Sequence, residues 1–415
     1  MSKSVIGRYV TAIDIGTTKI CVLIADTDAR EGLEIVGVGQ HPSHGLKKGV
    51  VVNVAKTAES IQAAVAQAQS MAGITVEHAT VGISGGHIKS YNSTGVVAIK
   101  GRDVSQYDIN RVIDAAKAIP MPQEQEILHI LPQYFRVDGQ EYVIDSLGMY
   151  GVRLEAQVHI ITGAVASAQN IIKSCELANI SVTDIVLEQL ASAEAVLTST
   201  EREVGAAIID IGGGTSDFAI YKDGRIRHTK VLPIAGTHFT NDVAIGLGIP
   251  LKEAEMLKRR FGIMGPDNQE LKGLIDVDLG YDGGTKPVDL RLSGEILRSR
   301  AEEIFELFAD EILEYRLSKF MPSGLILTGG GSLLAGIKNV AQDIIKGPVR
   351  IGYPLAHQGF QGQMPDILKS PIYATSYGLL LYATGENSAG MMTNIKEAPL
   401  LKVFRRMKSW IYDFL

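Results

Sequence analysis

Short apolar runs and amphipathic stretches follow one another along most of the sequence. Apolar runs of strand length predict strands at 33–40, 80–84, 95–100, 127–137, 155–162 and 181–187. Stretches of helix length, several with apolar residues at helical spacing, predict helices at 54–72, 102–119, 164–178, 188–197, 239–247, 251–261, 291–319 and 372–385. The chain is therefore predicted to mix strands and helices throughout.

One stretch combines an apolar strand, a glycine turn and a returning apolar strand. Ile208 to Ile220 reads IIDIGGGTSDFAI, with Asp210 at the end of the first run and Gly212 to Gly214 after it. Glycine permits positive φ and close approach of a ligand, and successive N–H groups in such a turn form an anion-binding concavity. Asp210 can hold a divalent cation through water, because Mg²⁺ keeps most of its hydration shell. A plain hairpin is the alternative for this stretch taken alone.

A second copy of this pattern lies near the N-terminus. Residues 12–26 read AIDIGTTKICVLIAD, so Asp14-Ile15-Gly16-Thr17-Thr18 aligns with Asp210-Ile211-Gly212-Gly213-Gly214. Two such hairpins that face each other across a cleft could grip a phosphate tail from both sides.

Composition narrows the class of protein. The chain has 415 residues, enough for two to three domains, and a formal charge of −6 that does not suggest a nucleic-acid partner. Cys21 and Cys175 lie in apolar surroundings, as buried small side chains do, which fits a reducing cytosol. We expect no signal peptide and no membrane-spanning helix. The dipeptide Gly-Lys does not occur, which excludes a P-loop.

The paired Asp-Ile-Gly turns resemble the two phosphate motifs of the actin-like ATPase superfamily. The resemblance implies an α/β fold, with two duplicated RNase H-like lobes around a nucleotide cleft that takes ATP and Mg²⁺. Asp14 and Asp210 would hold the cation, and Asp210 is also a candidate catalytic residue. The nucleotide contacts implied for the two turns come from Asp14, Gly16, Thr17, Thr18, Lys19, Asp210, Gly212, Gly213, Gly214, Thr215 and Ser216.

The same resemblance implies further site residues. Residues 325–337, LILTGGGSLLAGI, look like the adenosine turn, with Gly329, Gly330, Gly331 and Ser332, the last a candidate N-cap. Glu188 opens a helix at the position that places the attacking water, although a carboxylate is also simply favourable there. Gly236 lies in the Ala-Gly-Thr turn near the ligand. Glu255 and Lys258 would hold the ribose and adenine, or form a surface ion pair.

The isolated histidines suggest no chemistry of their own. His87, His129, His159 and His238 stand apart from one another in the sequence. We expect solvated or packed side chains and no metal site at any of them.

The C-terminal segment has a different character. Residues 385–399 are predicted to form a linker, and 400–415, LLKVFRRMKSWIYDFL, an amphipathic helix. Sixteen residues make about 24 Å of helix, too short to span a bilayer. Apolar and basic side chains on opposite faces favour a helix lying in a membrane interface, with a helix docked on the protein's own surface as the alternative. The predicted membrane contacts are Phe404, Met407, Trp410, Ile411, Phe414, Lys402, Arg405 and Arg406.

Taken together, the sequence resembles the FtsA family of bacterial actin-like cell division proteins over nearly its full length. The resemblance is carried by residues 81–88, VGISGGHI, by Asn92-Ser93-Thr94-Gly95 and by the basic tail. It implies a filament on the cytoplasmic face of the inner membrane at the division site, anionic lipid as a ligand and at most weak ATPase activity. It also implies that residues 227–305 bind the FtsZ C-terminal peptide, with Arg291, Arg298 and Arg300 as candidates, and that 83–162 bind later division proteins.

The family organisation predicts nine segments and leaves two alternatives. The first lobe takes 1–82, 163–197 and 347–384; the inserted α+β subdomain 83–162; the second lobe 198–226 and 306–346, with an accessory subdomain at 227–305; then come the linker 385–399 and the helix 400–415. The alternatives are a small-molecule kinase of the same superfamily and a pilus-assembly actin-like ATPase.

Overall fold

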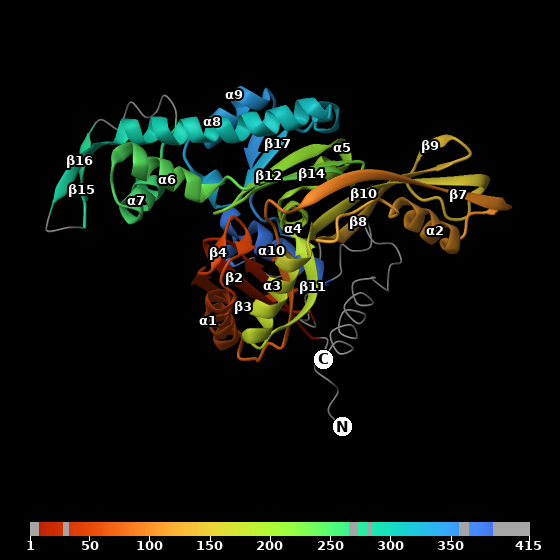
Figure 1. The fold of residues 1–415 in the computed structure, drawn as a ribbon, viewed down its shortest axis with the longest axis horizontal. Coiled ribbons are helices and arrows are strands. Elements are labelled where there is room, and N and C mark those ends of the chain that lie inside the picture. Colours follow the sequence, from red (N-terminus) through yellow and green to blue (C-terminus); the bar gives the residue numbers. More distant parts are fainter. Residues whose placement is uncertain (1–7, 28–32, 265–272, 281–283, 357–364, 385–415) are drawn as a thin grey trace.

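A computed structural model describes residues 8–27, 33–264, 273–280, 284–356 and 365–384 of the chain. Two lobes lie one above the other, and two smaller parts extend from them to opposite ends of the long axis (Figure 1). The predicted linker 385–399 and helix 400–415 lie outside the described residues. In the part of the chain that is described, no helix is long and apolar enough to cross a membrane.

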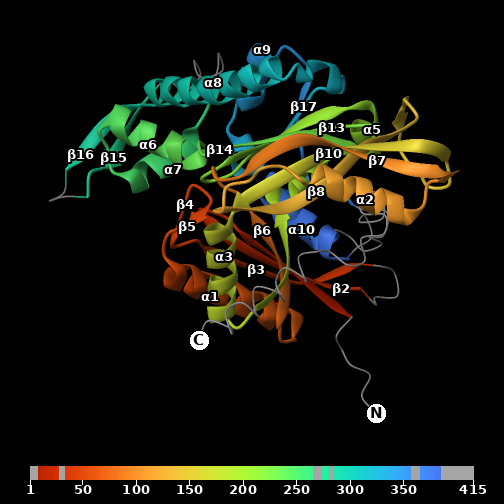
Figure 2. The same ribbon diagram turned by 45° about the vertical axis from the view of Figure 1, so that its right-hand side comes forward.

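The first lobe contains a five-stranded sheet with the order β11-β6-β1-β2-β3. β1, β2 and β3 are antiparallel neighbours, whereas β1, β6 and β11 run parallel. The strands are β1 (Tyr9–Ile15), β2 (Lys19–Asp26), β3 (Glu34–Pro42), β6 (His78–Ile83) and β11 (Ser181–Leu187). Two helices, α1 (Val54–Ala72) and α3 (Val165–Leu177), lie along one side of this lobe (Figure 2). As predicted, α1 ends at Gly73, whose φ of 67° is left-handed.

The second lobe repeats this topology. Its sheet has the order β14-β13-β12-β17-β18, again with one antiparallel and one parallel half. The strands are β12 (Ala206–Ile211), β13 (Ser216–Lys222), β14 (Arg225–Leu232), β17 (Leu325–Thr328) and β18 (Val349–Ile351). In the two hairpins, Asp14 pairs with Cys21 and Asp210 with Asp217, each seven positions later. The predicted duplication of the lobes is therefore confirmed down to the register of the strands.

Two helices of mainly small and apolar residues lie between the lobes. They are α4 (Glu188–Val196) and α10 (Ala374–Thr384), and most of their side chains are buried. They pack closely because Gly378 faces the backbone of Ala191 with no room for a Cβ atom. The crossing of these two helices sets how near the lobes approach each other.

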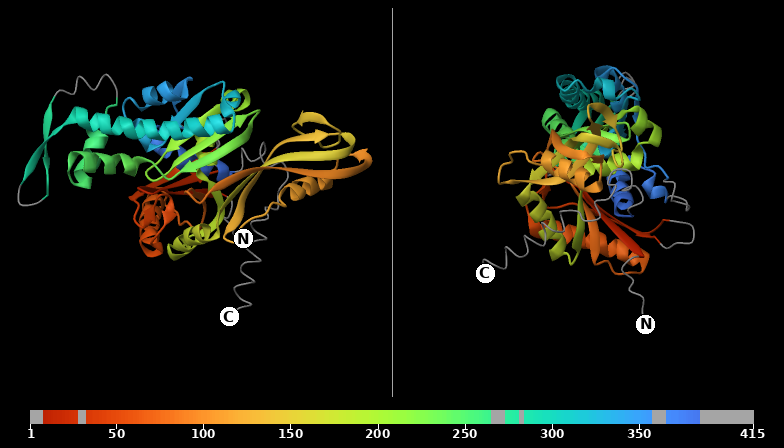
Figure 3. Two further views of the ribbon diagram at one scale, coloured as in Figure 1. Left: turned by 45° about the horizontal axis from the view of Figure 1, so that its top comes forward. Right: turned by 90° about the vertical axis from the view of Figure 1, so that its right-hand side faces the viewer.

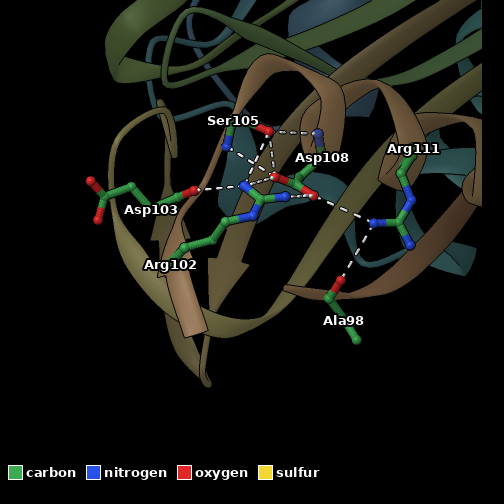
Figure 4. A network of polar contacts seen from close by, with 6 residues as sticks. All are labelled: Ala98, Arg102, Asp103, Ser105, Asp108 and Arg111. Atoms are coloured by element: carbon green, nitrogen blue, oxygen red, sulfur yellow. Dashed lines mark hydrogen bonds and ion pairs between the residues drawn. The ribbon is translucent and has the colours of Figure 1, made fainter. Parts of the chain in front are cut away.

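The inserted subdomain is a four-stranded antiparallel sheet with one helix on its face. The sheet order is β7-β10-β8-β9, with β7 (Lys89–Asp103), β8 (Gln125–Val137), β9 (Gln140–Val143), β10 (Tyr150–Ala164) and the helix α2 (Gln106–Ala116). It extends away from the lobes and has an apolar core of its own (Figure 3). Asp108 fixes the start of α2: it accepts hydrogen bonds from the Ser105 side chain at 2.5 Å and from Arg102 at 3.0 Å (Figure 4).

Most of the remaining elements belong to the second lobe and its accessory subdomain. They are the helices α5 (Ser199–Val204), α6 (Gly236–Leu247), α7 (Leu251–Phe261), α8 (Leu290–Glu314) and α9 (Ile337–Ile345) and the short strands β15 (Leu274–Asp278) and β16 (Thr285–Asp289). The short strands β4 (Leu46–Lys47) and β5 (Val50–Val51) precede α1 in the first lobe. The long helix α8 runs along the top of the lobe, and the β15–β16 hairpin lies at the far end from the inserted subdomain (Figure 1).

Two predicted helices are shorter in the structure, and β14 was not predicted. The helix predicted at 102–119 begins only at Gln106, because β7 continues to Asp103. The helix predicted at 291–319 ends at Glu314, because Arg316 adopts a left-handed φ of 52°. No strand was predicted at β14, whose Arg227, His228 and Thr229 are polar yet buried. Thr229 bonds His159 of the inserted subdomain, whereas His228 bonds Glu311 of α8. A pattern of apolar residues does not reveal such contacts.

The close crossing of α4 and α10 predicts the effect of one added methyl group. Gly378→Ala would push the two helices apart, so we expect a loss of about 1–3 kcal/mol of unfolding free energy. Urea denaturation measures it. The control is Gly347→Ala, where a Cβ would meet no atom within 4 Å. Equal stability of the two variants would contradict the close packing of α4 and α10.

Candidate functional site

The two predicted glycine turns meet between the lobes. We call residues 16–18 the first turn and 212–215 the second turn. A Cβ atom at Gly213 or Gly214 would overlap the side chain of Thr18 or Thr17, so glycine is needed for the turns to face each other this closely. Neighbouring backbone holds both: Gly49 N–H donates to Thr17 Oγ1 at 3.0 Å, and Gly236 N–H to the Gly212 carbonyl at 3.0 Å.

Four carboxyl groups gather around the two turns. Asp14 and Asp210 stand at the ends of β1 and β12, Asp217 lies opposite Asp210 on β13, and Glu188 begins α4. The three aspartates are buried, each at most 6% exposed. The facing cation is Lys19, whose Nζ lies 3.9 Å from Asp14 and donates to the Ile372 carbonyl at 2.8 Å. The site thus holds more acidic groups than this cation can balance.

Burial raises the pKa of each of these acids, and repulsion by neighbouring carboxylates adds to it for Asp14, Asp217 and Glu188. Burial raises the pKa of Asp14 to about 6, with a contribution from Asp210 and opposed by Lys19. The pKa of Asp217 rises to about 7, chiefly through burial and despite its hydrogen bond from Ser84. Burial and then repulsion by Asp14, Asp217 and Asp210 raise the pKa of Glu188 well above its usual range. Each shift favours the protonated form of the acid relative to an exposed carboxyl group.

Asp210 accepts hydrogen bonds from hydroxyl groups of α4 and α10, the two helices between the lobes. Ser192 of α4 and Thr375 of α10 donate to Asp210 Oδ2, the second at 2.9 Å. Ser84, at the end of β6 in the first lobe, donates to Asp217 Oδ1 at 2.5 Å. The acids of the second lobe are thus oriented by the two helices between the lobes and by the first lobe.

The predicted third glycine turn adjoins this cluster. Gly329 has a φ of 79° and leaves no room for a Cβ atom beside Asp210, and Gly331 packs on Ile211. Ser332 does not act as the predicted N-cap: its hydroxyl donates to the Gly329 carbonyl at 2.7 Å. The next α-helix, α9, begins only at Ile337, after Gly336. Ser332 therefore forms a hydrogen bond within its own turn and caps no helix.

The predicted pair on α7 is present and connects to the second turn. Lys258 Nζ lies 2.6 Å from Glu255 Oε2 and donates to the Gly236 carbonyl at 3.0 Å. Burial lowers the pKa of Lys258, opposed by Glu255. Gly236 N–H in turn donates to the Gly212 carbonyl, so the ion pair is joined to the second turn through one residue.

Other residues predicted to contact the nucleotide or the FtsZ peptide make different contacts in the structure, and the predicted membrane contacts are not among the described residues. Ser216 is fully buried and donates to the Ile234 carbonyl at 2.7 Å, away from the first turn. Arg291, Arg298 and Arg300 each pair with acids of the same chain, respectively with Asp289 at 3.1 Å, Glu302 at 2.7 Å and Asp242 at 2.5 Å. All eight predicted membrane contacts, in 400–415, lie outside the described residues.

Sequence reasoning missed Asp217 as a site residue. The signal was available, because a hairpin with a four-residue turn pairs Asp210 with the residue seven positions later. Among the described residues, no group of three or more His, Cys, Asp or Glu side chains is arranged to ligate a metal. The acidic cluster nonetheless fits a hydrated divalent cation, whose charge would offset the repulsion of its carboxylates.

Family models and curated relatives identify the family. A model described as "Cell division protein FtsA" matches residues 207–378, and "SHS2 domain inserted in FTSA" matches 85–162. A Pseudomonas aeruginosa protein named cell division protein FtsA is 42% identical over 98% of both chains. The chain belongs to the FtsA family. The Escherichia coli K12 member of the FtsA family is 34% identical over 99% of both chains.

Solved structures agree with the actin-like fold expected of the FtsA family. The PilM–PilN type IV pilus biogenesis complex matches with a TM-score of 0.66 over 90% of this chain and 98% of that one, at 16% identity. MreB5 of Spiroplasma citri bound to ADP matches with a TM-score of 0.53 over 94% and 99%, also at 16% identity. The predicted fold class is confirmed, and at such identities these likenesses concern the fold alone.

The raised pKa of Asp217 predicts a pH dependence of stability. A raised carboxyl pKa stabilises the folded state fully below the unfolded value of about 3.9, and this contribution is lost as the pH rises through about 7. Asparagine resembles the protonated acid. Without nucleotide or divalent cation, we therefore expect Asp217→Asn to gain stability relative to the parent between about pH 5 and about pH 7.5. Thermal unfolding at each pH measures it.

A surface variant separates this effect from a general loss of charge. Asp366 is exposed and its pKa is lowered by Lys369, so Asp366→Asn should show no such trend. A stability difference between Asp217→Asn and the parent that does not change with pH would contradict the raised pKa.

Proposed function

We propose that the protein binds ATP with Mg²⁺, assembles into actin-like filaments on the inner face of the cytoplasmic membrane, and anchors FtsZ filaments there during cell division. The observation that carries the proposal is the junction of two glycine turns lined by four carboxyl groups, in a chain of the FtsA family. Backbone N–H groups of such turns suit phosphates, and the acids suit the accompanying cation.

The residues of the junction suggest a division of roles. The two turns would cradle the phosphates, Asp14 and Asp210 would hold the hydrated cation, and Gly236, Glu255 and Lys258 would border the nucleoside. Bound Mg²⁺ would supply positive charge that favours the ionised carboxyls and the polyphosphate together. Glu188 would then be a carboxylate able to orient a water molecule, which fits weak ATPase activity at most. Nucleotide occupancy would favour a closed protomer that joins its neighbours.

Exposed apolar side chains of the accessory subdomain suit the FtsZ peptide better than its three candidate arginines do. These arginines are paired with acids, as described above, whereas Ile245, Leu251 and Leu274 are well exposed at 81%, 58% and 71%. An acidic peptide with apolar residues could contact these side chains while it competes for the arginines. On the inserted subdomain, Tyr107, Tyr142 and Tyr150 are similarly exposed, which supports a contact with later division proteins.

The membrane would be reached through residues 400–415. One short amphipathic helix binds lipid weakly, and each basic residue adds about 1 kcal/mol on an anionic surface. Many such helices on one filament bind well, because each bound helix raises the effective concentration of the next. Membrane binding would therefore depend on both the tail and nucleotide-driven assembly.

Co-sedimentation with anionic liposomes tests this proposal. We expect Trp410→Glu to reduce pelleting at least about tenfold, because a charge replaces the aromatic side chain in the interface, while ATP affinity is unchanged. Ser409→Glu is the matched control: it adds the same charge to the polar face and should retain most of the binding. A chain ending at Glu386 should not pellet, and the parent should pellet better with Mg-ATP.

The opposite pattern would contradict the proposal. If Trp410→Glu pelleted like the parent, the tail would not be the membrane contact. If the full chain pelleted neither with nor without Mg-ATP, the protein would be an actin-like nucleotide-binding protein without a membrane role.

A further inference from the structure

A histidine of the inserted subdomain contacts the first lobe one residue away from the acidic cluster. His129 lies on β8 and is buried. Its Nε2 atom accepts a hydrogen bond from the backbone N–H of Leu187, with an N–N distance of 3.1 Å. Leu187 ends β11, an edge strand of the first sheet, and the next residue is Glu188. The imidazole therefore fixes the backbone where β11 passes into α4.

The start of α4 has no side-chain cap. The N-cap position is Leu187, which is buried and pairs with Ile83 of β6. In contrast, α2 and α5 both begin with a capping box. The Leu187 N–H points away from its sheet to a side chain of another subdomain. The hydrogen bond from Leu187 to His129 thus joins the first turn of α4 to the inserted subdomain.

The Glu188 side chain packs so closely on its neighbours that a small shift of the backbone would move it. A Cβ atom on Gly82 of β6 would lie 3.1 Å from Glu188 Cγ and 3.4 Å from its Oε1, so the glutamate stem packs directly over this glycine. β6 and β11 are parallel neighbours, with Gly82 paired with Val186 and Ile83 with Leu187. A displacement of Leu187 would therefore move the Glu188 carboxyl relative to the other acids of the cluster.

His129 is suited to act as a constant acceptor. Burial lowers its pKa to about 4, so the ring is neutral near pH 7. Acceptance at Nε2 places the proton on Nδ1, the tautomer that the Leu187 N–H requires. The hydrogen bond is thus available throughout the neutral pH range.

A second buried histidine at the same junction contacts the other lobe. His159 of β10 bonds Asn92 through Nδ1 at 2.8 Å and Thr229 of β14 through Nε2 at 2.9 Å. Burial, with a contribution from His228, lowers its pKa to about 3, so it too is neutral. It resembles His129 in burial and charge but lies beside no residue of the acidic cluster, which makes it a matched control.

We propose that His129 is a positioning residue for Glu188, through which the inserted subdomain sets the geometry of the nucleotide cleft. The inference rests on the proposed function in that the cleft takes Mg-ATP and Glu188 orients a water molecule there. A partner that moves the inserted subdomain would change the position of this carboxyl, and nucleotide binding would in turn change the mobility of the subdomain.

The test compares His129→Leu, His129→Gln and His159→Leu in the full chain. We expect His129→Leu to slow single-turnover hydrolysis of Mg-ATP about tenfold, with nucleotide affinity changed less than about twofold. His129→Gln keeps an acceptor and should restore most of the rate, and His159→Leu should leave it unchanged. Backbone amide exchange in residues 183–190 should accelerate in His129→Leu but not in His159→Leu.

Glu188→Gln separates failure of this inference from failure of the proposed function. If Glu188→Gln slows hydrolysis and His129→Leu does not, His129 is not a positioning residue. Equal effects of His129→Leu and His159→Leu would also overturn the inference, since a general loosening of the junction would suffice. If Glu188→Gln has no effect on hydrolysis, the role proposed for Glu188 is wrong, and the exchange comparison alone decides whether His129 holds the start of α4.

Discussion

The structure depends on the concentration of buried carboxyl groups where its two lobes meet. Four acids surround two glycine turns, with Lys19 as the nearby cation that faces them. Like charges at this depth oppose ionisation, so the site is stable when its acids are protonated or when a cation is present. The serine and threonine hydroxyls that bind Asp210 and Asp217 come from the connecting helices and the opposite lobe. The same contacts that orient the acids therefore join the two halves of the molecule.

The duplicated hairpins, the fold class and most elements could be predicted because their signals are local. The run from Ile20 to Ala25 is apolar at every position since both faces of its sheet are covered. The approach of the two glycine turns followed from the repeated Asp-Ile-Gly motif. Resemblance supplied Glu188 and the pair Glu255–Lys258, and the structure places both beside the turns or their neighbours.

The sequence alone does not predict the contacts that polar residues make with distant parts of the chain. β14 was missed because its buried His228 and Thr229 are polar: Thr229 bonds the inserted subdomain and His228 bonds α8. Ser216 belongs to the glycine motif but bonds Ile234, since the strand alternation turns it to the other side. The sequence does not show that Arg291, Arg298 and Arg300 are each paired with an acid of the same chain. His129 was an isolated histidine in the sequence and acquires a role only through Leu187.

We expect the site between the two turns to bind a polyphosphate only together with a divalent cation. Calorimetric titration of the protein with ATP, in the presence of Mg²⁺ and in the presence of a chelator, measures this. Clear binding is expected with Mg²⁺ and at least about tenfold weaker binding without it, because the carboxyl cluster and the phosphates would otherwise repel each other. Equal affinity under the two conditions, or no binding with Mg²⁺, would contradict it.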